Sequence, residues 1–157
     1  MIEAFIALGS NLGDRLRSLS EALDRIAREP GFSLRRASFA YETEPMGPPQ
    51  PRYLNAVAQV GTLLSPRVTL QKLHEIEEAL GRIRREKWGP REIDLDLLLF
   101  GDRVLESPRV PHPGLHERSF VLVPLVEIAP EVRHPRMGLA PAGSSRSSCP
   151  MHRNLTR

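Results

Sequence analysis

Cysteine, aromatic residues and long apolar runs are scarce in this sequence, and each scarcity excludes a class of protein. The chain of 157 residues has one cysteine, Cys149, so no internal disulfide can form. Aromatic residues make up 5% of the chain, which is few for a surface that stacks nucleic-acid bases. The N-terminus has neither a basic leading segment nor an apolar run long enough for a signal peptide or a membrane span. We therefore expect a cytoplasmic protein that binds neither a membrane nor nucleic acid.

Lysine is also scarce, so arginine supplies almost all of the positive charge. The net charge is +3 and the pI is near 9.6, which favours an anionic partner without separating nucleic acid from a phosphorylated small ligand. Arginine suits bidentate phosphate binding, although genome composition or thermal adaptation would also explain its abundance. The length and a hydrophobic content of 40% predict one domain with a real core. The oligomeric state cannot be deduced, and we expect a monomer.

Hydrophobic periodicity predicts alternating strands and helices over the first hundred residues. Leucine and isoleucine recur at three and four residues between Asp14 and Glu29, which predicts a helix. Ser65 and Pro66 supply an N-cap and a first position for a second helix that ends at Gly81. Short apolar stretches predict strands at 2–9 (ending at Gly9), 32–43, 53–64 and 92–100. The order strand, helix, strand, strand, helix, strand is that of a ferredoxin-like α+β sandwich.

The chain beyond Gly101 forms a C-terminal extension to this sandwich. Prolines interrupt residues 110–130, where we expect a loop, a short helix and further core packing. Residues 137–157 are small and polar with almost no apolar periodicity, which is typical of a mobile tail. The sequence thus predicts one domain over residues 1–136 followed by that tail.

Two carboxylates, Asp94 and Asp96, interrupt the apolar run of the last predicted strand. Strand alternation predicts one face with Asp94, Asp96 and Leu98, and an opposite face with Ile93, Leu95, Leu97 and Leu99. Because the two helices of this architecture cover one side of the sheet, the aspartates can point into a cleft on the other side. Neighbouring carboxylates repel unless a cation or an arginine compensates them, and hard oxygen ligands of this kind suit Mg²⁺. The alternative is a structural ion pair with nearby arginines.

A basic loop directly precedes the aspartates. Its residues include Arg82, Arg84, Arg85, Lys87 and Arg91, together with Trp88. Such a loop can close over polyphosphate, and because the chain has no G-x-x-x-x-G-K-[ST] stretch, arginine forks and metal ions would hold the phosphates. The alternative is a solvated loop without a ligand.

A second polar group lies on the predicted third strand, where Tyr53 and Asn55 share a face. The amide of Asn55 can donate and accept hydrogen bonds at once, which suits a flat heterocycle with alternating donors and acceptors. The alternative is a partly buried aromatic beside a strand-edge hydrogen bonder. In this fold the third and fourth strands flank the first, so the two polar groups lie about 10 Å apart. A substrate could bind at one and react at the other.

The chain closely resembles the 6-hydroxymethyl-7,8-dihydropterin pyrophosphokinase family of folate biosynthesis. The resemblance covers roughly residues 2–136 through the segments IALGSNLGDR, YETEPMGPPQPRYLNAV, LGRIRREKWGPREIDLDLLLFG and VPHPGLHERSFVLVPLVEIAP. It implies that the hydroxymethyl oxygen of the pterin attacks the β-phosphorus of ATP, so that the whole pyrophosphoryl group is transferred and AMP leaves. It also implies two Mg²⁺ ions that bridge the phosphates.

The resemblance assigns a role to each matched position. Metal ligands are Asp94 and Asp96, and the residues that act on the charge developing during transfer are Arg82 and Arg91. Positions around ATP are His74, Glu77, Arg84, Lys87, Trp88, Leu97, His112 and Arg118. Pterin-pocket positions are Thr43, Met46, Tyr53, Asn55 and Phe120, with Trp88 also stacking on the ring. Ser107 and Arg109 reverse the family's order of basic and hydroxyl groups, so neither receives an ATP contact.

Two other classes of protein remain as alternatives. A non-catalytic ferredoxin-like nucleic-acid binder would need exposed strand aromatics within a K/R-G-F/Y-type motif, and the sequence has none. A metal-dependent nucleotidyltransferase would explain the aspartates and arginines. It would not explain Tyr53 and Asn55 beside the proline-rich stretch 44–51.

Overall fold

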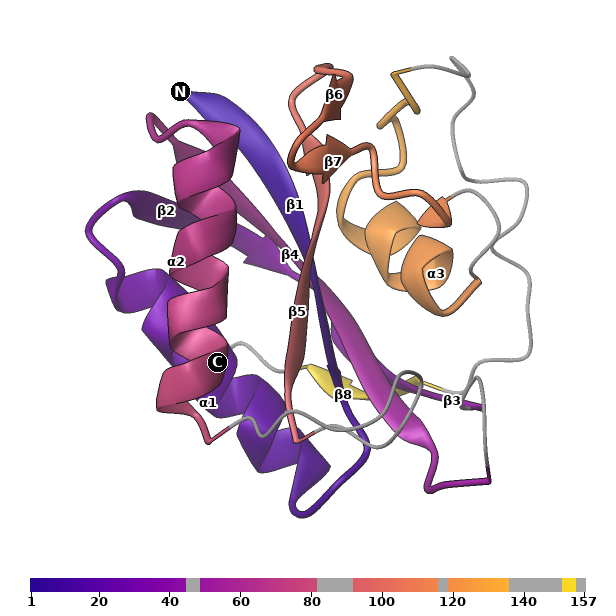
Figure 1. The fold of residues 1–157 in the computed structure, drawn as a ribbon. Helices are drawn as coiled ribbons and strands as arrows, with labels where there is room; N and C mark the ends of the chain where they lie inside the picture. The colour runs from indigo at the N-terminus through magenta and orange to yellow at the C-terminus, as the bar shows by residue number, and fades with distance from the viewer. Residues whose placement is uncertain (45–48, 82–91, 116–118, 136–150, 155–157) are drawn as a thin grey trace.

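A six-stranded antiparallel sheet crosses the molecule in a computed structural model that describes residues 1–44, 49–81, 92–115, 119–135 and 151–154. Along the chain the elements are β1 (Ile2–Ser10), α1 (Arg15–Arg28), β2 (Phe32–Ala37), β3 (Phe39–Thr43), β4 (Tyr53–Thr62), α2 (Pro66–Ala79), β5 (Asp94–Phe100), β6 (Leu105–Glu106), β7 (Arg109–Val110), α3 (Ser119–Ile128) and β8 (Met151–Asn154). The sheet has the order β5-β1-β4-β3-β8, with β2 also pairing with β4, and β6 pairs with β7 separately (Figure 1). The protein is therefore a mixed α/β molecule built on an antiparallel sheet.

Local sequence signals determine where the first two helices begin. The Asp14 carboxylate accepts a hydrogen bond from the Arg17 amide at 3.1 Å and caps α1. The Ser65 hydroxyl accepts from the Val68 amide at 3.2 Å and caps α2, whose first residue is Pro66. Both caps satisfy amides that have no partner within the helix. The sequence-based prediction of these two helices is confirmed.

The predicted strand 32–43 is wrong in one respect, because the structure divides it into β2 and β3 at Ser38. The register against β4 shifts there, since Ala37 pairs with Ala58 whereas Tyr41 pairs with Asn55. The Ser38 hydroxyl accepts a hydrogen bond from the Val57 amide at 3.0 Å, in place of a backbone carbonyl. A serine side chain thus fills a gap in the ladder, as happens at a β-bulge.

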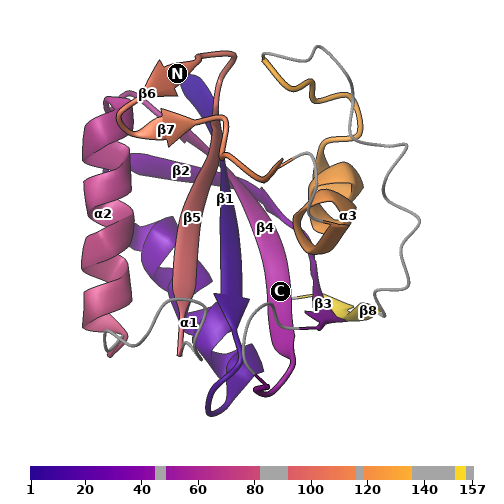
Figure 2. The same ribbon diagram turned by 45° about the vertical axis from the view of Figure 1, so that its right-hand side comes forward.

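Each face of the sheet has its own apolar core. The first core lies between the sheet and the helices α1 and α2, and includes Ile6, Leu23 and Leu73. The second lies under α3 and includes Phe5, Val57 and Leu125. Figure 2 shows α1 and α2 on one side of the sheet and α3 on the other. The expectation that the second face is open is therefore wrong for the part that α3 covers.

The register of β5 also corrects one face assignment. Leu99 packs in the core under α3 with Leu98, although strict alternation predicts opposite faces for these two residues. The pairing with β1 shifts between Phe5 and Ile6, so that Leu97 and Leu99 pair with adjacent residues of β1. This irregularity leaves Leu98 as an extra residue and turns Leu99 over. Asp94 and Asp96 precede the shift, so their predicted shared face is unaffected.

Strand β8 lies in the segment for which the sequence predicts no regular structure. Phe39, Ala40 and Tyr41 of β3 pair with it, so β8 extends the sheet beyond β3 (Figure 1). The mobility expected for residues 137–157 stays a prediction. Within the described part of the chain, no helix combines the length and apolar character that crossing a membrane requires.

Candidate active site

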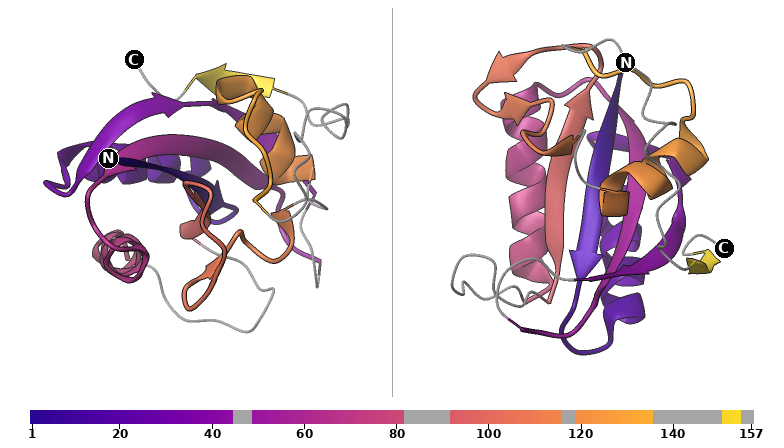
Figure 3. Two further views of the ribbon diagram at one scale, coloured as in Figure 1. Left: turned by 90° about the horizontal axis from the view of Figure 1, so that it is seen from above. Right: turned by 90° about the vertical axis from the view of Figure 1, so that its right-hand side faces the viewer.

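A row of four residues crosses one end of the sheet. Asp94 of β5 pairs with Gly9 of β1, Gly9 pairs with Asn55 of β4, and Asn55 pairs with Tyr41 of β3. Directly paired residues of antiparallel strands project on the same face, so these four share the face on which α3 lies. We call this set the polar row. In the right-hand view of Figure 3, α3 crosses the sheet away from the end of β1 where the row lies.

Asp94 of the polar row and its neighbour Asp96 lie at the start of the edge strand β5. Asp94 and Asp96 are partly exposed, whereas Ile93, Leu95 and Leu97 are buried in the core on the opposite face. The predicted alternation over these five residues is confirmed. Two residues apart on one strand, the aspartates project side by side about 7 Å apart. Hard oxygen donors at this spacing fit Mg²⁺, which takes one or two carboxylates and completes its coordination with phosphates and water.

Gly9 is a site residue that sequence reasoning missed. The sequence was interpreted as a strand that ends at Gly9, but β1 continues through Ser10 and Gly9 lies inside the ladder. A Cβ atom at this position would lie 3.1 Å from Asn55 Oδ1 and 3.5 Å from a ring carbon of Tyr53. Any side chain at this position would therefore crowd Asn55 and Tyr53.

The predicted pterin residues of β3 and β4 come together beside the row. Asn55 is 8% exposed and its Nδ2 donates a hydrogen bond to Thr43 Oγ1. Thr43 pairs with Tyr53 in the register, and Tyr53 is partly exposed. Phe120 is in α3, which packs against β3 and β4. Met46 lies outside the described residues.

Asn11 and Arg15 hold the segment that leads into β4, and neither is among the site residues predicted from the sequence. Asn11, 1% exposed, donates to Gln50 Oε1 at 2.8 Å and to the Pro51 carbonyl at 2.9 Å. Arg15 Nη1 donates to Glu42 Oε2 at 2.8 Å and to the Arg52 carbonyl at 2.9 Å. The turn after β1 and the first residue of α1 are therefore tied to both sides of the β3–β4 connection. Their place in the matched segment IALGSNLGDR was the available signal.

Two of the predicted ATP residues, Glu77 and His112, form hydrogen bonds with the backbone of β5. Glu77 of α2 is 2% exposed, and its Oε2 accepts from the Leu95 amide at 2.7 Å. The His112 amide donates to the Leu98 carbonyl at 2.8 Å, and His112 Nδ1 accepts from the Gly114 amide at 3.3 Å. Leu97 is 4% exposed in the first core. Because its side chain is buried, only its backbone can contact a ligand.

His74 is exposed on α2, three residues before Glu77. The remaining predicted site residues, Arg82, Arg84, Lys87, Trp88, Arg91 and Arg118, lie outside the described residues. Among the residues that are described, no three His, Cys, Asp or Glu side chains cluster as a metal site. The two predicted metal ligands, Asp94 and Asp96, are both described, and they share one face of β5.

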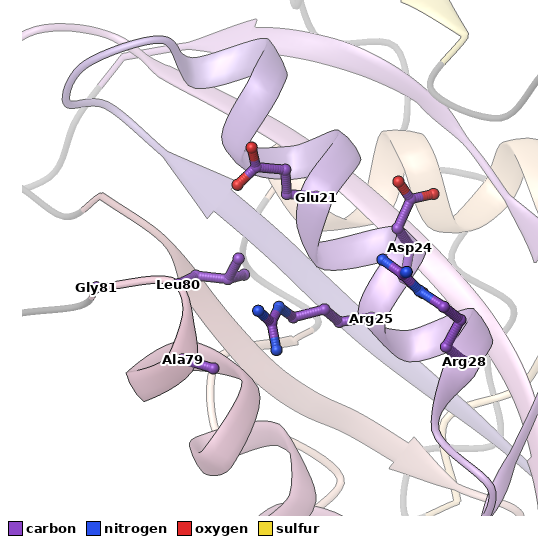
Figure 4. Close-up of a pocket in the computed structure, with 7 residues that line it drawn as sticks. All are labelled: Glu21, Asp24, Arg25, Arg28, Ala79, Leu80 and Gly81. Carbon is purple, nitrogen blue, oxygen red and sulfur yellow. The ribbon is translucent and has the colours of Figure 1, made fainter.

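A pocket of about 570 Å³ lies elsewhere, between α1 and the end of α2 (Figure 4). It is lined by Glu21, Asp24, Arg25, Arg28, Ala79, Leu80 and Gly81. Its two carboxylates balance its two guanidinium groups, which does not suit a polyphosphate. The pocket is on the side of the sheet that α1 and α2 cover, away from the polar row.

Comparison with known proteins points to one family. The family model of 7,8-dihydro-6-hydroxymethylpterin-pyrophosphokinase (HPPK) matches residues 5–130. A 2-amino-4-hydroxy-6-hydroxymethyldihydropteridine pyrophosphokinase of Synechocystis is 47% identical over 137 residues, covering 86% of this chain and 70% of the relative. The protein of the same name in Haemophilus influenzae is 44% identical, covering 84% of each chain. That of Methylorubrum extorquens is 40% identical, covering 93% of this chain and 99% of the relative.

Solved structures with the same fold are also found. An HPPK-DHPS in complex with substrates aligns with a TM-score of 0.71 at 13% identity, over 92% of this chain and 43% of that chain. A Plasmodium falciparum HPPK-DHPS A437G with SDX-DHP aligns with a TM-score of 0.74, also at 13% identity, over 92% of this chain and 45% of that chain. At such identity the likeness concerns the fold alone, and this chain spans less than half of those solved chains.

Proposed function

Because the chain belongs to the 7,8-dihydro-6-hydroxymethylpterin-pyrophosphokinase family, we propose that the polar row is where its two substrates meet. The protein is a pyrophosphokinase of folate biosynthesis, which transfers the pyrophosphoryl group of ATP to the hydroxymethyl group of 6-hydroxymethyl-7,8-dihydropterin and yields AMP and the pterin diphosphate. One observation carries the site assignment: Asn55 and Asp94 flank Gly9 in the register. They lie on strands two spacings apart, about 10 Å.

The pterin binds at the β3–β4 side of the row. Asn55 is buried and bonded to Thr43, so its amide is held in one orientation for a heterocycle. Tyr53 and Phe120 supply aromatic surface, and Met46 belongs to the same pocket. Asn11 and Arg15 keep the connection between β3 and β4 in place through four hydrogen bonds. A rigid pocket favours binding because less conformational entropy is lost.

The triphosphate of ATP binds at the Asp94 side with two Mg²⁺ ions. When bound, Mg²⁺ would neutralise the charge of the phosphates. Asp94 and Asp96 would hold the metal from the sheet. Arg82 and Arg91 act on the charge that develops at the β-phosphoryl group, and Arg84, Lys87 and Arg118 contact the nucleotide phosphates.

The nucleoside part of ATP lies along the outer edge of β5. The Leu95 amide points away from β1, because Glu77 accepts its hydrogen bond there. Alternation places the Leu97 amide on that same edge, so the backbone of Leu97 can bind the base. Glu77 and His112 both form hydrogen bonds with the backbone of β5. We assign His74 and Trp88 to nucleotide binding as well.

In the transfer step the hydroxymethyl oxygen forms a bond to the β-phosphorus. The bond from that phosphorus to the oxygen bridging the α- and β-phosphates breaks, and AMP leaves with this oxygen. The hydroxyl proton is released to solvent. The side chains of the row orient the two reactants, which is most of what an enzyme contributes to phosphoryl chemistry.

The arrangement of the sheet supports the ferredoxin-like description of residues 1–136. Strands β5, β1 and β4 follow the expected order, β2 and β3 together take the place of the second strand, and α1 and α2 share one side. We place the pyrophosphokinase activity in this single domain, acting as a cytoplasmic monomer, and treat residues 137–157 as its tail.

Product analysis tests the function. Purified protein is incubated with ATP and Mg²⁺, with and without hydroxymethyldihydropterin, and nucleotides are separated. AMP and pterin diphosphate are expected in equal amounts, and only when all three components are present. ADP as the product would show single phosphoryl transfer, and pterin-independent AMP would show nucleotide hydrolysis, so either result contradicts the assignment.

A further inference from the structure

One carboxylate of α3 binds two different groups of β3. Both oxygens of Glu127 accept from the Phe39 amide, at 3.1 and 3.0 Å, and Oε1 also accepts from the Tyr41 hydroxyl at 2.5 Å. The bonds from the Phe39 amide are exposed to solvent, whereas the bond from the Tyr41 hydroxyl is partly buried. Glu127 therefore joins the end of α3 to the strand that carries Tyr41 of the polar row.

Apolar packing determines the rotation of α3 about its axis only approximately. Its sequence, SFVLVPLVEI, is apolar on nearly every side, and Glu127 is its only ionisable residue. The buried residues Val121, Leu122, Leu125 and Ile128 form one broad face of the helix, which packs on the sheet. Since hydrophobic contact is non-directional, a broad face of this kind allows small changes of rotation. The directional bonds of Glu127 select one rotation.

The rotation of α3 in turn sets the position of Phe120. Phe120 and Glu127 are seven residues apart, which places them on the same stripe of the helix, about two turns apart. Tyr41, 7% exposed, is the register partner of Asn55. The hydroxyl of Tyr41 thus connects the strand beside Asn55 to the helix stripe that carries Phe120.

We propose that the Tyr41–Glu127 hydrogen bond is a positioning contact that sets Phe120 relative to Asn55 and thereby governs affinity for the pterin. The proposal rests on the function given above, since it concerns the pterin side of the same site. Neither residue contacts the reacting atoms. Their effect is transmitted through α3.

Dissociation constants for hydroxymethyldihydropterin and for an ATP analogue test the proposal. Tyr41→Phe keeps the ring and removes the hydroxyl, and we expect the pterin constant to rise about 2- to 30-fold with the ATP constant unchanged. Glu127→Ala should weaken pterin binding similarly. Glu127→Gln keeps an oxygen acceptor and should stay near the parent. Once Glu127 is replaced by alanine, the Tyr41 hydroxyl has lost this partner. The double variant Tyr41→Phe/Glu127→Ala should therefore have the same pterin dissociation constant as Glu127→Ala.

Arg36→Ala is the matched control. Arg36 Nη1 donates to the Ile128 carbonyl at 3.1 Å, so this change also removes a bond between α3 and the sheet, away from the polar row. It should leave pterin affinity unchanged. Equal weakening by Arg36→Ala, joint weakening of pterin and ATP, or parental pterin affinity in Tyr41→Phe would each overturn the proposal. So would loss of the fold in Tyr41→Phe, because the contact would then be structural.

The parent protein separates this proposal from the function on which it rests. Parent protein that forms no AMP with the pterin refutes the function itself. If the parent protein forms AMP but the Tyr41→Phe variant binds the pterin with parental affinity, only the positioning role is refuted.

Discussion

Asp96 should matter far more for activity than for stability. It is partly exposed and lies beside a second carboxylate, so replacing it relieves repulsion and removes one proposed metal ligand. For Asp96→Ala we expect a Tm within a few degrees of the parent and a rate loss of about two orders of magnitude, using roughly 3 kcal/mol for metal-mediated charge stabilisation. Thermal melts and turnover at saturating Mg²⁺ are measured on the same preparation.

Asp102→Ala is the control for this prediction, because Asp102 is an exposed carboxylate just beyond the same strand and outside the site. It should change neither quantity. If Asp96 instead belongs to a buried structural ion pair, its removal should cost roughly 3 to 5 kcal/mol of stability and the variant should melt much earlier. That outcome, or near-normal turnover in a folded variant, contradicts the metal role.

Replacing Gly9 with a larger residue should weaken pterin binding. In Gly9→Ala the new methyl group would lie 3.1 Å from Asn55 Oδ1, closer than ordinary contact, so the amide must move. Overpacking of this kind typically costs about 1 to 3 kcal/mol, which predicts a rise in the pterin dissociation constant of roughly 5- to 150-fold. Fluorescence titration with the pterin measures it.

Gly61→Ala provides the matched comparison. Gly61 pairs with Glu3 at the other end of the same sheet face, and a Cβ there meets the movable end of the Arg35 side chain. Pterin affinity should stay at the parental value. If the two alanine variants raise the pterin dissociation constant equally, Gly9 is not part of the pterin pocket.

At the scale of single elements, Glu77 links α2 to the outer edge of β5. Removing its carboxylate in Glu77→Ala leaves the buried Leu95 amide without that acceptor, which should lower the free energy of unfolding by about 1 to 3 kcal/mol. The start of β5 should also loosen, so the KM for ATP should rise. Glu77→Gln retains an acceptor oxygen and should recover most of the stability. Denaturant unfolding and initial-rate kinetics measure the two effects.

Glu78→Ala is the control on the same helix, since Glu78 is the exposed neighbour of Glu77. It should resemble the parent in both measurements. A Glu77→Ala variant that is as stable and as active as Glu78→Ala would show that the bond to Leu95 contributes nothing.

The elements differ in how well the sequence predicts them, for physical reasons. Helices α1 and α2 have a polar cap and one apolar stripe, so local signals suffice. The break at Ser38 depends on a hydroxyl that accepts from Val57, nineteen residues away, and no local pattern reveals such a contact. The apolar residues of α3 show that it is buried but not against which face it packs.

The site was predictable to the extent that it depends on strand alternation. The shared face of Asp94 and Asp96, and that of Tyr53 and Asn55, follow from the two-residue period. The role of Gly9 depends on its register with β4, and the role of Asn11 depends on its hydrogen bond to Gln50. Neither contact can be predicted from the local sequence around these residues. Leu97 was predicted near ATP, but only the fold shows that its side chain is buried.

At the scale of the whole molecule, the two faces of the sheet differ in what covers them. One face is covered by α1 and α2 and provides most of the core. On the other, α3 covers an apolar region, and the polar row lies toward the end of β1 (Figure 3). In the site that we propose, the two substrates bind on the strands that flank β1, so the strand spacing sets the distance between them.

Paired binding measurements test this arrangement most directly. Dissociation constants for the pterin and for Mg²⁺ with an ATP analogue are determined for the parent, Asn55→Ala and Asp96→Ala. A lost polar partner in a dry site costs about 1 to 3 kcal/mol, so Asn55→Ala should weaken the pterin roughly 5- to 150-fold and leave the nucleotide unchanged. Asp96→Ala should weaken only the Mg²⁺-dependent nucleotide binding. Equal weakening of both ligands by either variant would contradict a two-ended site across Gly9.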